Sequence, residues 1–169
     1  MTIKAPSITP GGRVAVAALW AALGVVALAG LGGLVTDLGP WYRALKQPWW
    51  QPPDVAFGPA WSVIYLLTAI AAVRVWLCSN APRERAQWLA ALAANGALNV
   101  LWSGLFFKAR RPDWALAEVV LLWLSIVLLI VLARRHDVMA ALLLVPYLLW
   151  VAFAASLNHA VVRLNGPFA

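Results

Sequence analysis

Residues 41–61 read WYRALKQPWWQPPDVAFGPAW, and this stretch organises the rest of the chain. It holds four of the eleven tryptophans and four of the eleven prolines. Pro48, Pro52 and Pro53 lack an N–H and push each preceding residue toward extended backbone geometry, so the stretch has a preset shape. It is too polar to cross a membrane and too aromatic for a passive linker. We interpret it as a semi-rigid lid over a pocket between the flanking helices.

The composition is that of a membrane protein. Hydrophobic residues make up 64% of the 169 residues and charged residues 11%, whereas soluble domains have about 45–50% and about 25%. A small globule is mostly surface and cannot bury such an excess of apolar side chains. The sequence therefore predicts an integral, multi-pass membrane protein.

Five segments are long and apolar enough to cross the bilayer, which takes about 20 residues for about 30 Å of hydrocarbon. Unpaired backbone groups are unfavourable in lipid, so these segments are helices. The predicted fold class is all-α, an integral membrane bundle of five transmembrane helices in one domain over residues 1–169, with a long Trp/Pro-rich first loop at 37–56. The expected spans cover approximately residues 14–36, 57–78, 86–107, 114–133 and 138–162.

Several function classes are disfavoured by the sequence. The net charge of +7 is spread over short connectors rather than gathered on one face, which argues against nucleic-acid binding and is typical of charge flanking membrane spans. Cys78 is the only cysteine, and His136 and His159 lie far apart, so we expect no disulfide and no metal site. The apolar run after Arg13 is too long for a signal peptide. No catalytic constellation is visible.

The third span has two different faces. Successive helical residues turn by about 100°, which places Asn95, Asn99, Trp102 and Phe106 on one stripe. Asparagines facing lipid would be unfavourable, so they should face the interior, where they either bond neighbouring helices or line a ligand cavity. Small residues lie roughly opposite and predict either close internal packing or a homodimer seam. These small residues are Ala90, Ala93, Ala94, Ala97 and Gly104.

Aromatic residues in the second and fifth spans extend the pattern. Trp61 and Tyr65 share a face and follow the proline loop directly, which fits either an interfacial aromatic belt or a pocket wall. In the fifth span, Trp150 lies deep on the face of Ala154, and Pro146 can kink the helix. Indole faces with a few amides and hydroxyls suit a flat, largely apolar ligand.

The fourth span carries one acidic residue, Glu118, about one turn inside its start. We expect Glu118 to reach the membrane surface or to pair with Lys108 or Arg110. A role in an intramembrane proton relay is a weaker alternative.

The motifs taken together resemble the translocator protein family, also called the tryptophan-rich sensory protein or peripheral benzodiazepine receptor family. The resemblance covers residues from about 41 to 165, in the family's order and spacing. It rests on WYRALKQPWWQPP, Trp61-x3-Tyr65, Asn99-x2-Trp102-x3-Phe106-Phe107, PYLLW from Pro146 to Trp150, and Ser156-Leu157-Asn158 with Arg163 and Asn165.

The resemblance implies a five-helix bundle that usually dimerises and that binds porphyrins such as protoporphyrin IX and haem, sterols in eukaryotic members, and benzodiazepine-site drugs. No cofactor is required; the tetrapyrrole is the ligand. It implies a site under the first loop lined by Tyr42, Pro52, Trp61, Asn95, Asn99, Trp102, Phe106, Trp150 and Ala154.

The resemblance leaves three hypotheses for the output. One is a receptor or carrier that regulates or transports porphyrin intermediates. Another is light- and oxygen-dependent degradation of protoporphyrin, for which the family implicates the positions of Trp61 and Trp150. The third is a ligand-sensing scaffold for a partner protein. His159 replaces the tyrosine of the eukaryotic cholesterol-recognition segment ahead of Arg163, so any sterol binding should be weak. The composition is typical of a bacterial member.

Overall fold

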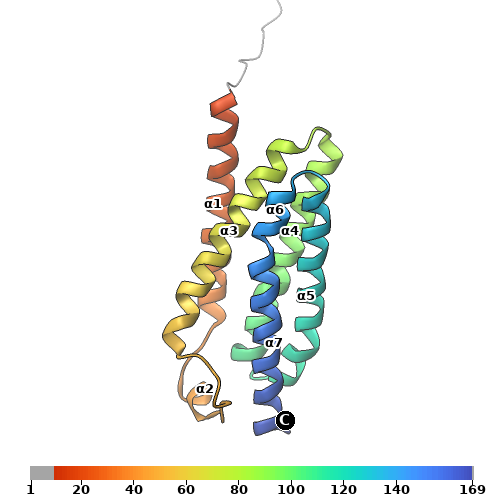
Figure 1. Ribbon diagram of the computed structural model, residues 1–169. Helices are drawn as coiled ribbons and strands as arrows, with labels where there is room; N and C mark the ends of the chain where they lie inside the picture. Colours follow the sequence, from red (N-terminus) through yellow and green to blue (C-terminus); the bar gives the residue numbers. More distant parts are fainter. Residues whose placement is uncertain (1–9, 169) are drawn as a thin grey trace, which may run out of the picture.

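The computed structural model describes residues 10–168, and within them every regular element is helical (Figure 1). Five long helical segments run alongside one another, and a short helix and a turn lie in the loop after the first. The elements are α1 (Pro10–Val35), α2 (Pro40–Ala44), the 3-10 turn η1 (Asp54–Ala56), α3 (Phe57–Cys78), α4 (Pro82–Ser103), the π-helical turn η2 (Gly104–Lys108), α5 (Pro112–Arg134), α6 (Val138–Leu143) and α7 (Val145–Asn165).

Prolines begin several of these helices, because the first helical residue needs no N–H. Pro82 opens α4 and Pro112 opens α5. The Glu84 carboxylate accepts the backbone N–H of Ala81 at 3.3 Å, which satisfies one donor at the start of α4. The helical third segment therefore begins four residues before the expected residue 86.

The fifth segment is broken near its start. α6 ends at Leu143 and α7 begins at Val145, one residue before Pro146. Proline cannot donate to the preceding turn and its ring crowds the carbonyl there, so the segment bends at this point. The bend allows α6 to pack on α3 while α7 packs along α5.

The helices close a ring. α1 packs against α3 and α4, α4 against α5, α5 against α6 and α7, and α6 against α3. Figure 1 shows the loop with α2 at the end of this bundle where α3 begins and α7 ends. The ring therefore has a lid at one end and the α3–α4 and α5–α6 connections at the other.

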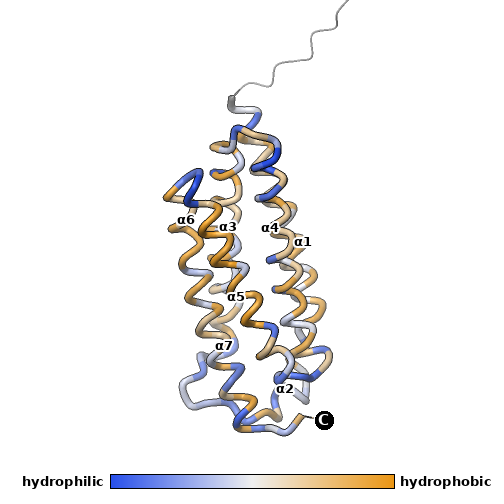
Figure 2. The backbone as a smooth tube through the Cα atoms, turned by 90° about the vertical axis from the view of Figure 1, so that its right-hand side faces the viewer, coloured by the Kyte–Doolittle hydropathy of each residue, from blue (hydrophilic) through white to orange (hydrophobic). Residues whose placement is uncertain are grey.

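Apolar side chains cover the outside of the bundle, and Figure 2 shows apolar helices with hydrophilic residues gathered toward their ends. On α1, Trp20 is 69% exposed and Leu34 80% exposed. Among residues 10–168, five helical segments are long and apolar enough to span a membrane: Gly11–Val35, Asp54–Cys78, Pro82–Lys108, Pro112–Arg134 and Val138–Asn165. The predicted fold class, an all-α five-helix membrane bundle, is confirmed.

One ion pair fastens the end opposite the lid. Asp137 caps α6 by accepting the Ala140 N–H at 3.1 Å, and its other oxygen lies 2.7 Å from the Arg74 guanidinium on α3. Burial alone would raise the pKa of Asp137, but these hydrogen bonds and the guanidinium hold it below its usual range. The ionised carboxylate thus links α3 to α6.

Candidate functional site

A chain of hydrogen bonds crosses four helices inside the ring. The Tyr147 hydroxyl on α7 accepts from Asn99 Nδ2 at 3.1 Å and donates to Asn95 Oδ1 at 3.2 Å. The Tyr65 hydroxyl on α3 donates to Asn99 Oδ1 at 3.4 Å, and Asn95 Nδ2 donates to Ser125 Oγ on α5 at 2.7 Å. Both asparagines are about 95% buried. The α4 amides therefore form hydrogen bonds to neighbouring helices, as the first of the two interpretations of the sequence predicted.

Aromatic rings gather beside these amides, in what we call the tryptophan–tyrosine cluster: Trp61, Tyr65, Tyr147 and Trp150. The Trp61 ring lies 5.4 Å from that of Tyr65, 6.0 Å from that of Tyr147 and 6.5 Å from that of Trp150. Phe57 meets Trp150 edge-on at 5.7 Å. The cluster therefore joins the N-terminal half of α3 to α7, directly below the lid.

A second aromatic group lies where α4 ends. Trp102 and Phe106 have ring centroids 5.4 Å apart, and Phe106 and Phe107 4.8 Å. The π-helical turn η2 carries both phenylalanines; such turns are frequent at functional sites. Two lid residues cover this group, with Trp41 6.3 Å from Phe106 and Tyr42 5.5 Å from Phe107.

Trp102 connects the two aromatic groups. It packs against the same apolar core as Trp61 and Trp150 as well as against the core around Phe106. Its indole N–H donates to Asn158 Oδ1 on α7 at 3.2 Å, and Asn158 Nδ2 donates to the Pro112 carbonyl at 2.8 Å. One continuous aromatic and amide surface thus runs from the lid into the bundle.

The predicted lining residues are distributed over this surface. Trp61, Asn95, Asn99 and Trp150 lie in or beside the tryptophan–tyrosine cluster, and Tyr42, Trp102 and Phe106 form part of the second group. Pro52 lies in the lid and Ala154 on α7, one turn after Trp150, and both are half-buried.

The lid is tied internally by a small polar triad. The Tyr42 hydroxyl donates to Asp54 Oδ1 at 3.1 Å, and Gln51 Nε2 donates to both groups at 3.3 Å. Partial burial and the neighbouring Asp54 carboxylate raise the pKa of Tyr42 to about 12. Tyr42 therefore stays a neutral hydrogen-bond donor at physiological pH.

Asn165 at the end of α7 holds the lid to the bundle. Its Oδ1 accepts the Lys46 backbone N–H at 2.7 Å, and its Nδ2 donates to the Lys46 carbonyl at 2.9 Å. Trp50 adds an edge-on ring contact with Phe153 of α7 at 5.8 Å. The lid is thus fixed against α7 by a two-point amide clamp and an aromatic contact.

A groove of about 740 Å³ lies between the lid and the outer side of α7. Indole faces of Trp49 and Trp50 form one side, and Trp49 is 96% exposed. His159 and Arg163 are on the other side. The groove is a second place where the lid and α7 could hold an apolar ligand with an acidic group.

Between residues 10 and 168, two buried polar groups near the bundle interior have no hydrogen-bond partner. The Thr68 hydroxyl, one turn after Tyr65 on α3, is one of them. The other is the Glu118 carboxyl on α5, whose residue is 6% exposed and whose oxygens are both unpaired. The expectation that Glu118 reaches the surface or pairs with Lys108 or Arg110 was wrong, because α5 turns this residue into the ring.

Sequence reasoning missed Ser125 and undervalued Tyr147 and Asn165. Ser125 is the only polar side chain in an apolar stretch of the fourth span, SIVLLIVLA, and that isolation was an available signal. Tyr147 shares the helical face of Trp150, but only the fold shows its hydroxyl between two asparagines. Asn165 lies 119 residues from its partner Lys46, a separation that periodicity cannot bridge.

Known proteins are similar in sequence to this chain over most of its length. The model of the TspO/MBR family matches residues 15–164. Protein CrtK of Rhodobacter capsulatus is 40% identical over 139 residues, which are 82% of this chain and 87% of that protein. Tryptophan-rich sensory protein of Cereibacter sphaeroides is 39% identical over 74% of this chain and 77% of its own length. Human translocator protein is 35% identical over 74% of this chain and 75% of its own length. The chain therefore belongs to the TspO/MBR family of membrane proteins.

Proposed function

We propose that this protein is a membrane receptor or carrier for tetrapyrroles such as protoporphyrin IX and haem, bound between the lid and the tryptophan–tyrosine cluster. The observation that carries the proposal is the continuous aromatic and amide surface below the lid. Flat π-systems stack on indole rings, and a few amides and hydroxyls fix their orientation. The protein would regulate or transport porphyrin intermediates.

The chemistry of the surface fits such a ligand. Trp61 and Trp150 offer indole faces from two helices, and the Thr68 hydroxyl is buried without a partner on the face of Trp61 and Tyr65. The asparagine amides can exchange their bonds with the Tyr147 hydroxyl for bonds to the propionate oxygens of the ligand. Of the predicted lining residues, Asn95, Asn99, Trp61, Trp150 and Ala154 would contact the ligand within the ring.

The lid supplies the gate. The rings of the cluster touch one another, with Trp61 5.4 Å from Tyr65 and 6.5 Å from Trp150, so a planar ligand enters by separating them. Release of the Asn165 clamp and the Trp50 contact would free the lid to rise. Tyr42 and Pro52 of the lid, with Trp102 and Phe106 beneath, would then close over the ligand.

A second candidate function is photo-oxidative degradation of the bound porphyrin. The observation favouring it is that Trp61 and Trp150 lie 6.5 Å apart at the centre of the cluster, where light-generated oxidants would meet two indoles. The third hypothesis, a sensing scaffold, would use the same ligand as input and a partner protein as output.

A homodimer through α4 is part of the proposal. Ala90, Ala93, Ala94 and Ala97 are exposed on the single chain, on the side opposite the buried asparagines. Small residues let two helices approach closely within lipid. Gly104, which is half-buried in η2, would extend the seam. Sterols should bind weakly, since His159 replaces the tyrosine of the eukaryotic segment.

Titration with protoporphyrin IX in the dark, followed by quenching of tryptophan fluorescence, tests the proposal. Wild type should saturate at micromolar ligand. Trp150→Phe should weaken binding by about tenfold, or about 1.4 kcal/mol, because a phenyl ring stacks over less area than an indole and has no N–H. Trp114→Phe is the matched control, because Trp114 is an exposed α5 tryptophan outside the cluster. Absence of saturable quenching in wild type would refute tetrapyrrole binding.

An illuminated sample separates the first two functions. If the protein is a receptor or carrier, the bound porphyrin should lose no more absorbance under light than free porphyrin does. A degrading protein converts the porphyrin to a new species, and Trp61→Phe should stop this conversion while dark binding survives.

A further inference from the structure

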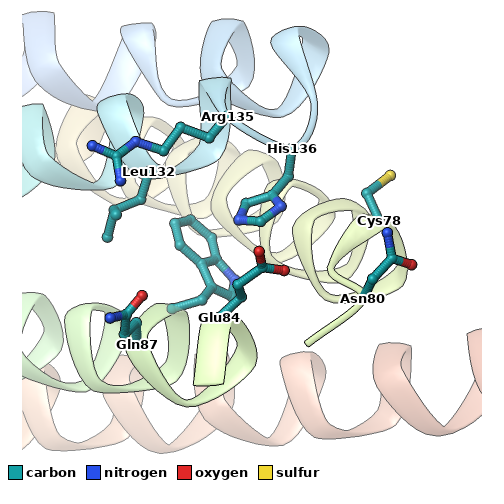
Figure 3. Close-up of a pocket in the computed structure, with 8 residues that line it drawn as sticks. Cys78, Asn80, Glu84, Gln87, Leu132, Arg135 and His136 are labelled. Carbon is teal, nitrogen blue, oxygen red and sulfur yellow. The ribbon is translucent and has the colours of Figure 1, made fainter. Parts of the chain in front are cut away.

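A polar cavity lies at the end of the bundle opposite the lid (Figure 3). Its volume is about 520 Å³, within the range of about 300–1,000 Å³ typical of ligand sites. Three elements meet there: the end of α3, the first turns of α4 and the end of α5. The lining residues are Cys78, Asn80, Glu84, Gln87, Trp88, Leu132, Arg135 and His136.

One residue that lines this cavity, Trp88, carries a buried hydrogen-bond donor. Trp88 is 2% exposed, and its indole Nε1–H has no hydrogen-bond partner among the described residues, 10–168. Buried N–H groups in folded proteins are nearly always paired, so an unpaired one in a residue that lines a cavity is a donor that a ligand could satisfy after a small rearrangement. The neighbouring Arg85 also has a buried, unpaired Nε–H, although its Nη2 bonds the Ser79 carbonyl at 2.9 Å.

The rim carries charges of both signs. Glu84 and His136 face one another across the opening, from α4 and from the α5–α6 connection (Figure 3). One Glu84 oxygen caps α4 through the Ala81 N–H, and the other has no hydrogen-bond partner among residues 10–168. Arg135 adds a guanidinium that contacts no carboxylate within the part of the chain that the structure describes. A ligand that fills the cavity must therefore offer acceptor oxygens to the donors and a donor to Glu84.

The depth of the cavity relative to the bilayer indicates which class of ligand it could bind. Its residues lie at the ends of three membrane-spanning segments, Asp54–Cys78, Pro82–Lys108 and Pro112–Arg134. Lipid headgroups occupy this level of the bilayer, where the hydrocarbon ends. An aminophospholipid headgroup there combines phosphate oxygens with a primary ammonium.

We propose that this cavity is a binding site for the headgroup of a zwitterionic aminophospholipid. The phosphate oxygens accept from the Arg135 guanidinium and the His136 imidazole, and from the Trp88 indole N–H once the side chains of the rim move apart to expose it. The ammonium donates to the free oxygen of Glu84. A bound lipid would fasten the C-terminal ends of α3 and α5 to the start of α4, far from the lid and independently of any tetrapyrrole.

Native mass spectrometry of the delipidated full chain in a neutral detergent tests this site. The probes are phosphatidylethanolamine, phosphatidylcholine and phosphatidylglycerol with the same acyl chains. We expect phosphatidylethanolamine to bind about tenfold more tightly than either other lipid, because a trimethylammonium cannot donate to Glu84 and a glycerol carries no charge. Equal binding of all three lipids would overturn the assignment.

Single substitutions test which residues bind the ammonium and which bind the phosphate of the headgroup. Glu84→Gln keeps the oxygen that caps α4, and it should weaken phosphatidylethanolamine binding about tenfold without weakening phosphatidylglycerol binding. Arg135→Gln and Trp88→Phe should weaken both. Arg134→Gln is the matched control, since Arg134 is an exposed neighbour that does not line the cavity. If Arg134→Gln lowers binding as much as Arg135→Gln, only general surface charge is involved and the proposal fails.

Soluble probes separate a lipid from a free anion. O-phosphoethanolamine should compete with the lipid at millimolar concentration, whereas inorganic phosphate should not. Competition by inorganic phosphate at equal potency would make the site one for a free anion and would overturn the lipid assignment. Trp88→Phe leaves a small cavity and can lower folding yield, so the Glu84→Gln and Arg135→Gln pair decides the outcome if that variant melts early.

Discussion

Asn165→Ala should open the lid without unfolding the bundle. The substitution removes both bonds between the Asn165 amide and the Lys46 backbone, of 2.7 and 2.9 Å, and leaves Lys46 N–H and C=O to bond water. It also removes the bond from Asn165 Nδ2 to the Val161 carbonyl, which stays paired within α7. The perturbation is therefore local to the lid.

The size of the effect follows from these two bonds. A net hydrogen bond contributes about 0.5–1.5 kcal/mol, and both of these are solvent-accessible, so we take about 0.5–1 kcal/mol each. Loss of about 1–2 kcal/mol raises the population of the open lid about 5- to 30-fold. Hydrogen exchange of amides in the lid is proportional to that population when closing is fast.

Hydrogen–deuterium exchange with mass spectrometry on peptides covering residues 37–56 measures this increase. Ser156→Ala is the matched control, because the Ser156 hydroxyl is at the same end of α7 but bonds only the Phe153 carbonyl of its own helix, at 2.6 Å. Peptides from α5 should exchange equally in all three proteins. Unchanged exchange of the lid in Asn165→Ala would refute the clamp.

Three further substitutions test other parts of the structure. Asp137→Asn keeps the α6 cap but removes the negative charge that pairs with Arg74. Because the folded pKa of Asp137 lies below its unfolded value, wild type loses the stabilisation from the ionised carboxylate as the pH falls through the folded pKa. The melting temperature of the variant should lack that acid-dependent drop. Asn99→Leu should lower the free energy of unfolding by about 1–3 kcal/mol, measured by chemical denaturation, because the Tyr147 hydroxyl loses a buried donor; an unchanged value would place the network outside the stabilising core. Ala93→Leu should convert dimer to monomer in sedimentation experiments, whereas Ala117→Leu, at an exposed α5 position, should not; equal behaviour of the two would rule out the α4 seam.

The fold could be predicted from the sequence because membrane solvation leaves few choices. Apolar runs of sufficient length must be helices, and the Trp/Pro stretch cannot cross the bilayer, so five helices and one long loop follow. The helix limits differ locally where side chains decide them. Pro82 and Glu84 start α4 early, and Pro146 divides the last segment into α6 and α7.

The interior was only partly predictable. Helical periodicity placed Asn95 and Asn99 on one stripe, and burial in the ring agrees with that placement. Periodicity could not show which helix lies opposite, so the bonds to Tyr147 and Ser125 emerge only from the fold. Glu118 shows the limit most clearly: an acidic residue near a helix end is expected at the surface, but the orientation of α5 buries it.

The position of the tetrapyrrole can be measured by locating bound zinc protoporphyrin through its anomalous X-ray signal in crystals of the complex. We predict one zinc peak inside the ring below the lid, within contact of Trp61, Asn99 and Trp150. A zinc peak in the groove between Trp49 and His159, or no ordered peak in crystals that contain the pigment, would contradict it.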